Sequence, residues 1–164
     1  MKELEELYKD IQPKIYSFFY VKTLDQNTAE DLTHDTFYEA MKGFNSFAGK
    51  STIQTWLFSI ANNLLKKYYR SKKYRKKLVE TLSKEDKKTN SLEEELMIKE
   101  RSGKLLEQIN QLDSLSKEIV TYRIYGELSF KEIGELIGKS ENYTRVAYHR
   151  AKLKLQKEME GFHG

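Results

Sequence analysis

Side chains that could do chemistry gather at three places in this chain of 164 residues. Carboxylates and a histidine lie between residues 30 and 39, eight bases and three tyrosines between residues 66 and 77, and further bases between residues 145 and 152. Carboxylates with histidine could ligate a metal or bind a basic partner, whereas clustered bases beside aromatic rings favour nucleic acid. Which chemistry applies depends on the elements that position these groups.

Metal or catalytic chemistry has little support in the acidic group. Glu30 and His34 are four residues apart, as are Asp31 and Asp35, so a helix would present each pair on one face. The chain has no cysteine, no glycine-rich phosphate loop and no nucleophile elbow. We therefore predict no enzyme activity, no catalytic residues, no metal, no cofactor and no small-molecule substrate. Exposed carboxylates would instead suit a basic protein surface, or form an ordinary solvated face.

The pattern of residues 129–155 is typical of a helix-turn-helix. Ser129 and Glu132 have the spacing of a capping box, Gly138 is suited to end the first helix, and Ser140 can cap the second. The second helix has an apolar side at spacings of four, three and four residues: Thr144, Tyr148, Ala151 and Leu155. Bases lie off that side: Arg145, His149, Arg150 and Lys152. This design places a helix in the DNA major groove. The alternative is a helical hairpin with a solvated basic surface.

The basic run continues the longest predicted helix. Ser51 and Gln54 have capping-box spacing, and apolar residues follow at helical intervals as far as Tyr68. The bases after Lys66 are spaced to follow a phosphate backbone, although a solvated helix end would have the same composition. Trp56, Phe58 and Tyr69 are rings on which an unstacked base could sit, with Trp56 better placed for the core.

Few glycines, a single proline and helical periodicity throughout predict an all-α fold. We expect helices near residues 4–20 and from Thr28, where Thr28 and Asp31 resemble a capping pair, with Met41 in the apolar stripe. Two small helical domains, residues 1–75 and 101–164, are predicted to flank a flexible linker over residues 76–100. The charged start of the chain is unlike a signal peptide and no apolar run could span a membrane, so we expect a cytoplasmic protein without membrane insertion.

Three separated segments resemble, in order, the extracytoplasmic-function group of bacterial sigma factors, which are small transcription-initiation subunits. AEDLTHDTFYEA (residues 29–40) resembles the segment that docks on the clamp helices of RNA polymerase. FNSFAGKSTIQTWLFSIANNLLKKYYR (residues 44–70) resembles the part that opens and reads the −10 element. ELSFKEIGELIGKSENYTRVAYHRAKLKL (residues 127–155) resembles the reader of the −35 element.

The resemblance implies roles for individual residues. Those expected to contact the polymerase clamp are Asp31, His34 and Asp35. Those expected at the −10 element are a loop that holds a flipped base (Phe47, Ala48, Gly49, Lys50 and Ser51), a pocket residue (Asn63) and guides for the upstream backbone (Lys66, Lys67 and Arg70). Those expected at the −35 duplex are Arg145, His149, Arg150 and Lys152.

The resulting hypothesis is an alternative-sigma-type initiation factor that binds core RNA polymerase, directs it to promoter DNA and helps open the −10 region. Elements roughly 17 base pairs apart are separated by about 58 Å, a distance that two domains and a linker can cover. The resemblance also implies an anti-sigma factor as a probable partner. The alternatives are a stand-alone helix-turn-helix regulator, which would dimerise on a palindromic operator without polymerase, and a helical adaptor with no nucleic-acid role.

Overall fold

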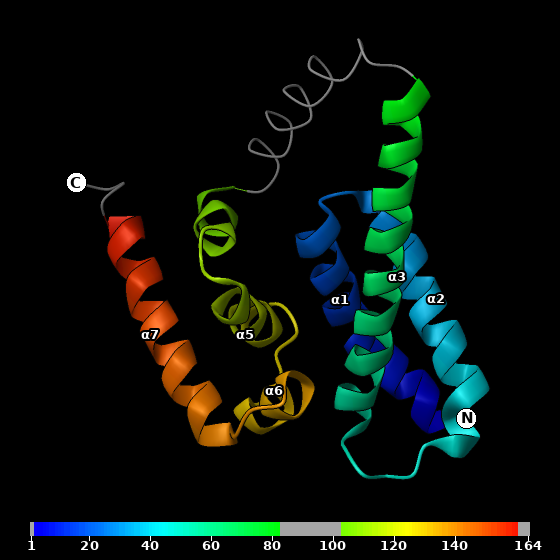
Figure 1. The fold of residues 1–164 in the computed structure, drawn as a ribbon. Coiled ribbons are helices and arrows are strands. Elements are labelled where there is room, and N and C mark those ends of the chain that lie inside the picture. Colours follow the sequence, from blue (N-terminus) through cyan, green and yellow to red (C-terminus); the bar gives the residue numbers. More distant parts are fainter. Residues whose placement is uncertain (1, 83–102, 161–164) are drawn as a thin grey trace.

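The computed structural model describes residues 2–82 and 103–160, and within these ranges it contains helices and no strands, as predicted. Figure 1 shows the arrangement, and the elements are α1 (Lys2–Thr23), α2 (Gln26–Gly43), the short 3-10 helix η1 (Phe44–Ser46), α3 (Ile53–Leu82), a helix over residues 103–110, α5 (Ser114–Ile124), α6 (Phe130–Ile137) and α7 (Glu141–Glu160). None of the described helices is long and apolar enough to cross a bilayer.

The first three helices form an N-terminal unit in which α2 packs against both α1 and α3. α1 runs through Pro13, which lies exposed inside the helix, and buries Ile11, Ile15 and Phe18 on its other side. α3 is held only along its first half, where Leu57, Phe58, Ala61 and Leu65 are buried. Its second half projects beyond the rest of the unit (Figure 1).

Two predicted helix starts are wrong. α2 begins earlier than Thr28, because the carboxylate of Asp25 accepts hydrogen bonds from the backbone N–H of Asn27 at 3.0 Å and of Thr28 at 3.5 Å. α3 is capped by the hydroxyl of Thr52, which accepts from the N–H of Thr55 at 3.2 Å, rather than by Ser51 and Gln54. In both places a nearby side chain with an acceptor oxygen, the Asp25 carboxylate or the Thr52 hydroxyl, satisfies the free amides.

α3 also continues further than the sequence indicated. Residues 76–82, expected at the start of the linker, form its last two turns, and every residue from Tyr69 to Leu82 is exposed. At 1.5 Å per residue the helix is about 45 Å long. The remainder of the predicted linker, residues 83–100, lies outside the described residues.

The C-terminal unit comprises residues 103–110 and the helices α5, α6 and α7. The expected capping box at α6 is confirmed in both directions: the N–H of Glu132 donates to the Ser129 hydroxyl at 3.1 Å, and the N–H of Ser129 donates to the Glu132 carboxylate at 3.0 Å. Gly138 ends α6 with φ of +72°, and Ser140 accepts from the N–H of Tyr143 at 3.0 Å. The predicted helix-turn-helix is therefore confirmed.

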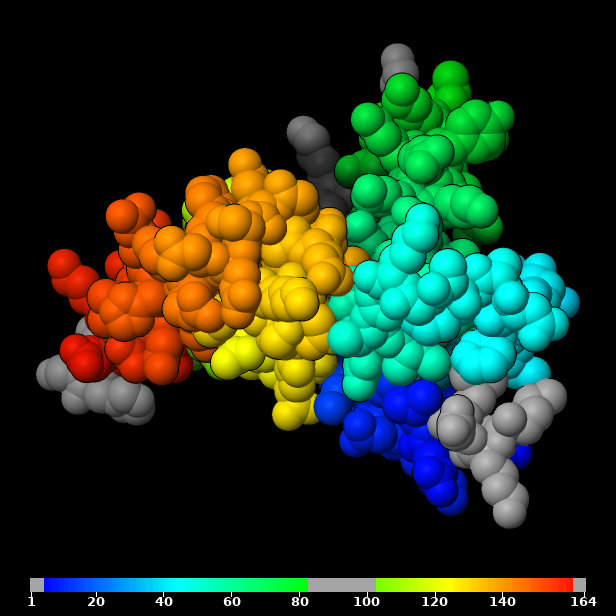
Figure 2. All heavy atoms as spheres, turned by 90° about the horizontal axis from the view of Figure 1, so that it is seen from below, coloured from blue at the N-terminus to red at the C-terminus, as the bar shows by residue number. Residues whose placement is uncertain are grey.

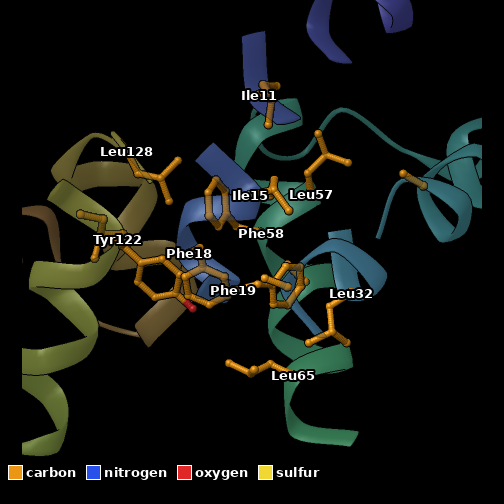
Figure 3. Close-up of a cluster of buried hydrophobic side chains, with 14 of the residues drawn as sticks. Ile11, Ile15, Phe18, Phe19, Leu32, Leu57, Phe58, Leu65, Tyr122 and Leu128 are labelled. Carbon is orange, nitrogen blue, oxygen red and sulfur yellow. The ribbon is translucent and has the colours of Figure 1, made fainter. Parts of the chain in front are cut away.

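The two units share one hydrophobic cluster (Figure 3), which draws residues from α1, α2 and α3 and also from α5 and α6. Tyr122 of α5 stacks on Phe18 at 5.3 Å between ring centroids and meets Phe58 edge-on at 6.0 Å. The C-terminal unit also contributes the buried Ile119, Leu128 and Ile133 to this cluster. A smaller cluster lies within the C-terminal unit beneath α7: Ile109, Leu112, Val120, Ala151 and Leu155.

Replacing Gly134 with alanine tests the close approach of α6 to the start of α7. A Cβ at Gly134 would lie 2.6 Å from the carbonyl oxygen of Lys139 and 3.3 Å from that of Ser140, and both are backbone atoms. We expect Gly134→Ala to lower the free energy of unfolding in urea by about 1–3 kcal/mol.

Gly43→Ala is the matched control, because a Cβ there would meet its nearest neighbour at an ordinary 3.6 Å. It should leave stability unchanged or raise it by up to about 1 kcal/mol. A Gly134→Ala protein as stable as the wild type would contradict the packing described for these helices.

Candidate nucleic-acid and protein interfaces

The carboxylates of α2 lie on its outer face. Asp31, His34 and Asp35 are all exposed, while the opposite side of the helix buries Ala29, Leu32, Thr33, Thr36 and Ala40. The hydroxyls of the two buried threonines donate to carbonyl oxygens one turn back, at 2.6 and 2.8 Å, so their burial leaves no polar group unsatisfied. No group of three or more metal-ligating side chains occurs among the described residues.

Sequence reasoning missed two large exposed side chains on the same helix. Tyr38 is 62% exposed and Met41 is 59% exposed, so placing Met41 in the apolar stripe was wrong. Tyr38 follows Asp35 by three residues and Asp31 by seven, which puts the ring beside the carboxylates. Exposed aromatic and apolar side chains next to the acidic face (Asp31, His34 and Asp35) are typical of a protein-binding site. The charged residues around Tyr38 in the sequence gave no indication of this apolar surface.

Loop 47–51 is anchored at one end and exposed at its tip. Phe47 packs on Trp56 with ring centroids 4.9 Å apart, while Ala48, Gly49 and Lys50 are exposed. Gly49 has φ of +69° and open space around it, so its backbone conformation rather than crowding favours glycine. The tip of the loop is thus open to a ligand while Phe47 fixes its base.

The far end of loop 47–51 is tied to the C-terminal unit. The Thr52 hydroxyl donates to the carboxylate of Glu132 at 2.5 Å, and the Thr55 hydroxyl reaches the same oxygen at 3.4 Å. Burial raises the pKa of Glu132, but hydrogen bonds from Thr52, Ser129 and Thr55 outweigh it, so the pKa lies below its usual value of 4.5. Figure 2 shows the surface of α6 beside the first turns of α3.

The exposed face of α3 carries amides and bases. Asn63, Lys66, Lys67 and Arg70 are exposed, opposite the buried Leu57, Ala61 and Leu65. Lys66, Arg70, Lys73 and Lys77 recur at spacings of four, three and four residues, so they form one row along about 16 Å of helix. Asn63 lies about 15 Å along the axis from Ile53, two to three turns beyond the attachment of loop 47–51.

Most of the aromatic rings suggested for base stacking make contacts within the protein instead. Phe58 is fully buried in the shared cluster, so the suggestion that a base could sit on it was wrong. Trp56 packs against the same cluster, as expected. The Tyr69 hydroxyl donates to the carbonyl oxygen of Lys22 at 2.7 Å, and burial of this end of the ring raises its pKa to about 12.

The second helix of the helix-turn-helix, α7, presents its bases on two sides. Arg145, His149 and Lys152 are exposed and share one side at spacings of four and three residues. Arg150 is also exposed but lies about 140° around the helix from Arg145. The predicted inner side is confirmed, since Thr144, Ala151 and Leu155 are buried and Tyr148 packs against both clusters.

Apolar surface between these two sides was not predicted. Val146 and Tyr143 are each more than two-fifths exposed. With Arg150, Asn142 and Ser140 they line an open groove of about 440 Å³ at the start of α7. Arg145 is oriented by Glu141, one turn away at 3.0 Å. The exposed surface of α7 therefore offers apolar and hydrogen-bonding groups together, as base edges in a major groove require.

Comparison with known families identifies both halves of the chain. Residues 7–75 match sigma-70 region 2, and residues 102–155 match sigma-70 region 4. The exposed face of α2, loop 47–51 and the row on α3 as far as Lys73 lie in the first match, and the helix-turn-helix lies in the second.

The matches to relatives extend over most of the chain. The chain is 32% identical over 161 residues to the RNA polymerase sigma factor YlaC of Bacillus subtilis, covering 95% of this chain and 91% of that protein. It is 29% identical over 150 residues to the ECF RNA polymerase sigma factor BldN of Streptomyces coelicolor, covering 88% of this chain and 56% of that protein. The fold matches RpoE of Bartonella quintana, solved with the anti-sigma factor NepR, with a TM-score of 0.66 and 17% identity over 98% of both chains.

Two regions of a sigma-70 factor, in order and on one chain, define a transcription-initiation subunit. The chain belongs to the RNA polymerase sigma factors, within the extracytoplasmic-function group. It is an alternative sigma factor that directs RNA polymerase to promoters, as the sequence indicated.

The low pKa of Glu132 predicts a specific acid sensitivity. A carboxyl whose pKa is lower in the folded state than in the unfolded state stabilises the fold fully above pH 4.5, and this contribution disappears as the pH falls through the lowered pKa. Glu132→Gln removes the titrating group while keeping a side chain that a capping box accepts.

We therefore expect wild type to be more stable than Glu132→Gln at pH 7, with the difference shrinking as the pH is lowered from 5 to 3. Urea denaturation at each pH measures it. Glu135→Gln, on the exposed side of α6, is the matched control and should show no such trend. A constant difference between wild type and Glu132→Gln over this range would count against the hydrogen bonds to Thr52 and Thr55.

Proposed function

We propose that this sigma factor divides its work among three exposed surfaces: the acidic face of α2 holds the polymerase, and two basic surfaces hold two promoter elements. The observation that carries the proposal is the separation of charge by helix, with carboxylates exposed on α2 and cations exposed on α3 and α7. A carboxylate face repels DNA, whereas the cations attract it, so the two kinds of surface select different partners.

The acidic face of α2 docks on the clamp helices of core RNA polymerase through Asp31, His34 and Asp35. Their exposure beside Tyr38 supports this role, since complementary charge orients the encounter while an exposed ring contributes contact area. Met41 extends the same contact toward the end of the helix.

The −10 element binds at loop 47–51 and along α3. The open tip of the loop, residues Ala48 to Lys50, receives a base flipped from the nontemplate strand, and Phe47 and Ser51 hold the tip in place. Asn63 helps to line the pocket for this base. Lys66, Lys67 and Arg70 bind the phosphate backbone of the DNA upstream of it. Flipping a base costs a few kcal/mol and breaks no covalent bond, so contacts and charge are sufficient for the task.

α7 binds in the major groove of the −35 element. Arg145, His149 and Lys152 face the duplex from one side of the helix and Arg150 from the other, with Val146 between them. Exposure of all five side chains supports this assignment. A stand-alone regulator would use the same helix but would leave the acidic face of α2 without a role.

The proposal extends to compartment and regulation. A factor that acts on polymerase and promoter DNA, and that needs no bond-making chemistry of its own, works in the cytoplasm as a non-enzyme. An anti-sigma factor is a further partner, in line with the complex known for the structural relative from Bartonella quintana.

Charge reversal on α2 tests polymerase docking. We expect Asp31→Lys with Asp35→Lys to weaken association with core polymerase at least tenfold, because both new cations meet a basic surface. Titration of labelled sigma factor with core enzyme measures the change. Both residues are exposed, so the midpoint of urea unfolding should stay near that of the wild type.

The control is Glu5→Lys with Glu6→Lys, which makes the same change of charge on exposed residues of α1. It should bind polymerase as the wild type does. Equal loss in both double variants would mean that net charge, rather than the acidic face of α2, determines the association.

The row of cations on α3 predicts a change in salt dependence. Lys66→Ala with Arg70→Ala removes two phosphate contacts, so the slope of log K against log salt for holoenzyme binding to promoter DNA should become shallower by about 2. Lys72→Ala with Arg75→Ala removes the same charge from other sides of the exposed helix and should leave the slope nearly unchanged. Matching slopes for both double variants would contradict a DNA-facing row.

A further inference from the structure

The side of α7 that faces away from the protein core has an apolar residue at its centre. Thr144 and Leu155 are buried, and a helix turns by about 100° per residue, so Val146 lies nearly opposite both of them. His149 and Arg150 follow Val146 by three and four residues and flank it at about 60° and 40° on either side. Val146 itself is 42% exposed. The part of α7 that points most directly away from the core is therefore a valine with basic side chains on both sides.

Val146 also lies in the part of α7 from which a recognition helix contacts bases. The first turns of the second helix of a helix-turn-helix reach the base edges in the major groove, and Val146 belongs to the second turn of α7. These turns, orange in Figure 2, lie at the surface of the C-terminal unit. Val146 lines the groove of about 440 Å³ together with Asn142 and Tyr143. The N–H of Tyr143 donates to the Ser140 hydroxyl at 3.0 Å, so a capped helix end presents Val146 to its ligand.

The groups around Val146 favour DNA as the ligand of this surface. Arg150 lines the same groove, and the ammonium group of Lys139 lies over the ring of Tyr143, 5.1 Å from its centroid. Such cations attract the phosphates that border a major groove. At the base edges within that groove, the C5-methyl group of thymine is the apolar group. Val146 has two methyl groups and a χ1 angle that the helix restricts, so it loses little conformational freedom when it packs against such a methyl group.

We propose that Val146 is a specificity-determining residue, which reads an A·T base pair in the −35 element by packing against the C5-methyl group of its thymine. The inference rests on the proposed function, because it names a contact between the same helix and the same DNA element. Cations that bind phosphates supply affinity without sequence information, whereas contact with the methyl group distinguishes thymine from the other bases. Val146 thereby adds an uncharged reader to the basic residues of α7.

Removing single methyl groups from the DNA tests this contact. A promoter that the holoenzyme transcribes is selected from a genomic library, and each thymine of its −35 element, on either strand, is replaced in turn by deoxyuridine. Deoxyuridine pairs with adenine as thymine does and lacks only the methyl group. Titration of each labelled duplex with holoenzyme at one salt concentration measures the affinity. With the wild-type sigma factor, we expect at least one substitution to weaken binding about fourfold, the loss that corresponds to one methyl group.

The same duplexes are then titrated with holoenzyme that contains a sigma variant. Val146→Ala should bind the thymine duplex several-fold more weakly than the wild type does, and it should bind the deoxyuridine duplex equally well, because alanine is too short to reach the methyl group. Leu153→Ala is the matched control, since Leu153 is 53% exposed on the same side of α7, two turns further along. It should discriminate between the two duplexes as the wild type does. Both residues are exposed, so the midpoint of urea unfolding should change little.

The proposal is overturned if the −35 element contains no thymine on either strand, or if no deoxyuridine weakens binding of the wild type. It is also overturned if the effect of deoxyuridine persists in Val146→Ala, because the methyl group would then act through the shape of the DNA or through another residue. Failure of the proposed function looks different. Scrambling the whole −35 element would then leave holoenzyme binding unchanged, and Val146→Ala would bind every duplex as the wild type does.

Discussion

The packing of Tyr122 against Phe18 and Phe58 is the contact on which the arrangement of the whole molecule depends. It merges what would be two small helical cores into one cluster, and aromatic pairs contribute about 0.5–1.5 kcal/mol beyond the area they bury. Small domains bury a limited fraction of their surface, so each unit gains from borrowing apolar partners from the other. The same contact fixes where the exposed surfaces of α3 and α7 lie relative to each other.

The functional surfaces follow from the core because each helix buries one side and exposes the opposite one. On α2 the buried threonines and alanines leave Asp31 and Asp35 outside, and on α7 the burial of Ala151 and Leu155 leaves Arg145 and His149 outside. α3 differs, since every residue of its second half after the half-buried Tyr68 is exposed. Its high content of Lys, Arg, Leu and Glu suits an exposed helix, so local propensity sustains it to Leu82.

Features that depend on residues close together in the sequence could be predicted, whereas contacts between distant parts of the chain could not. The capping box of Ser129 and Glu132, the end of α6 at Gly138 and the inner side of α7 are local patterns, and all three were predicted. Thr52 and Asp25 were missed because Ser51 and Thr28, one and three residues away, also have side chains that can cap a helix. The pairing of Tyr122 with Phe18 joins distant parts of the chain, and helical periodicity identifies buried faces without saying which faces meet. Phe58 was therefore offered as a stacking ring when it belongs to the core.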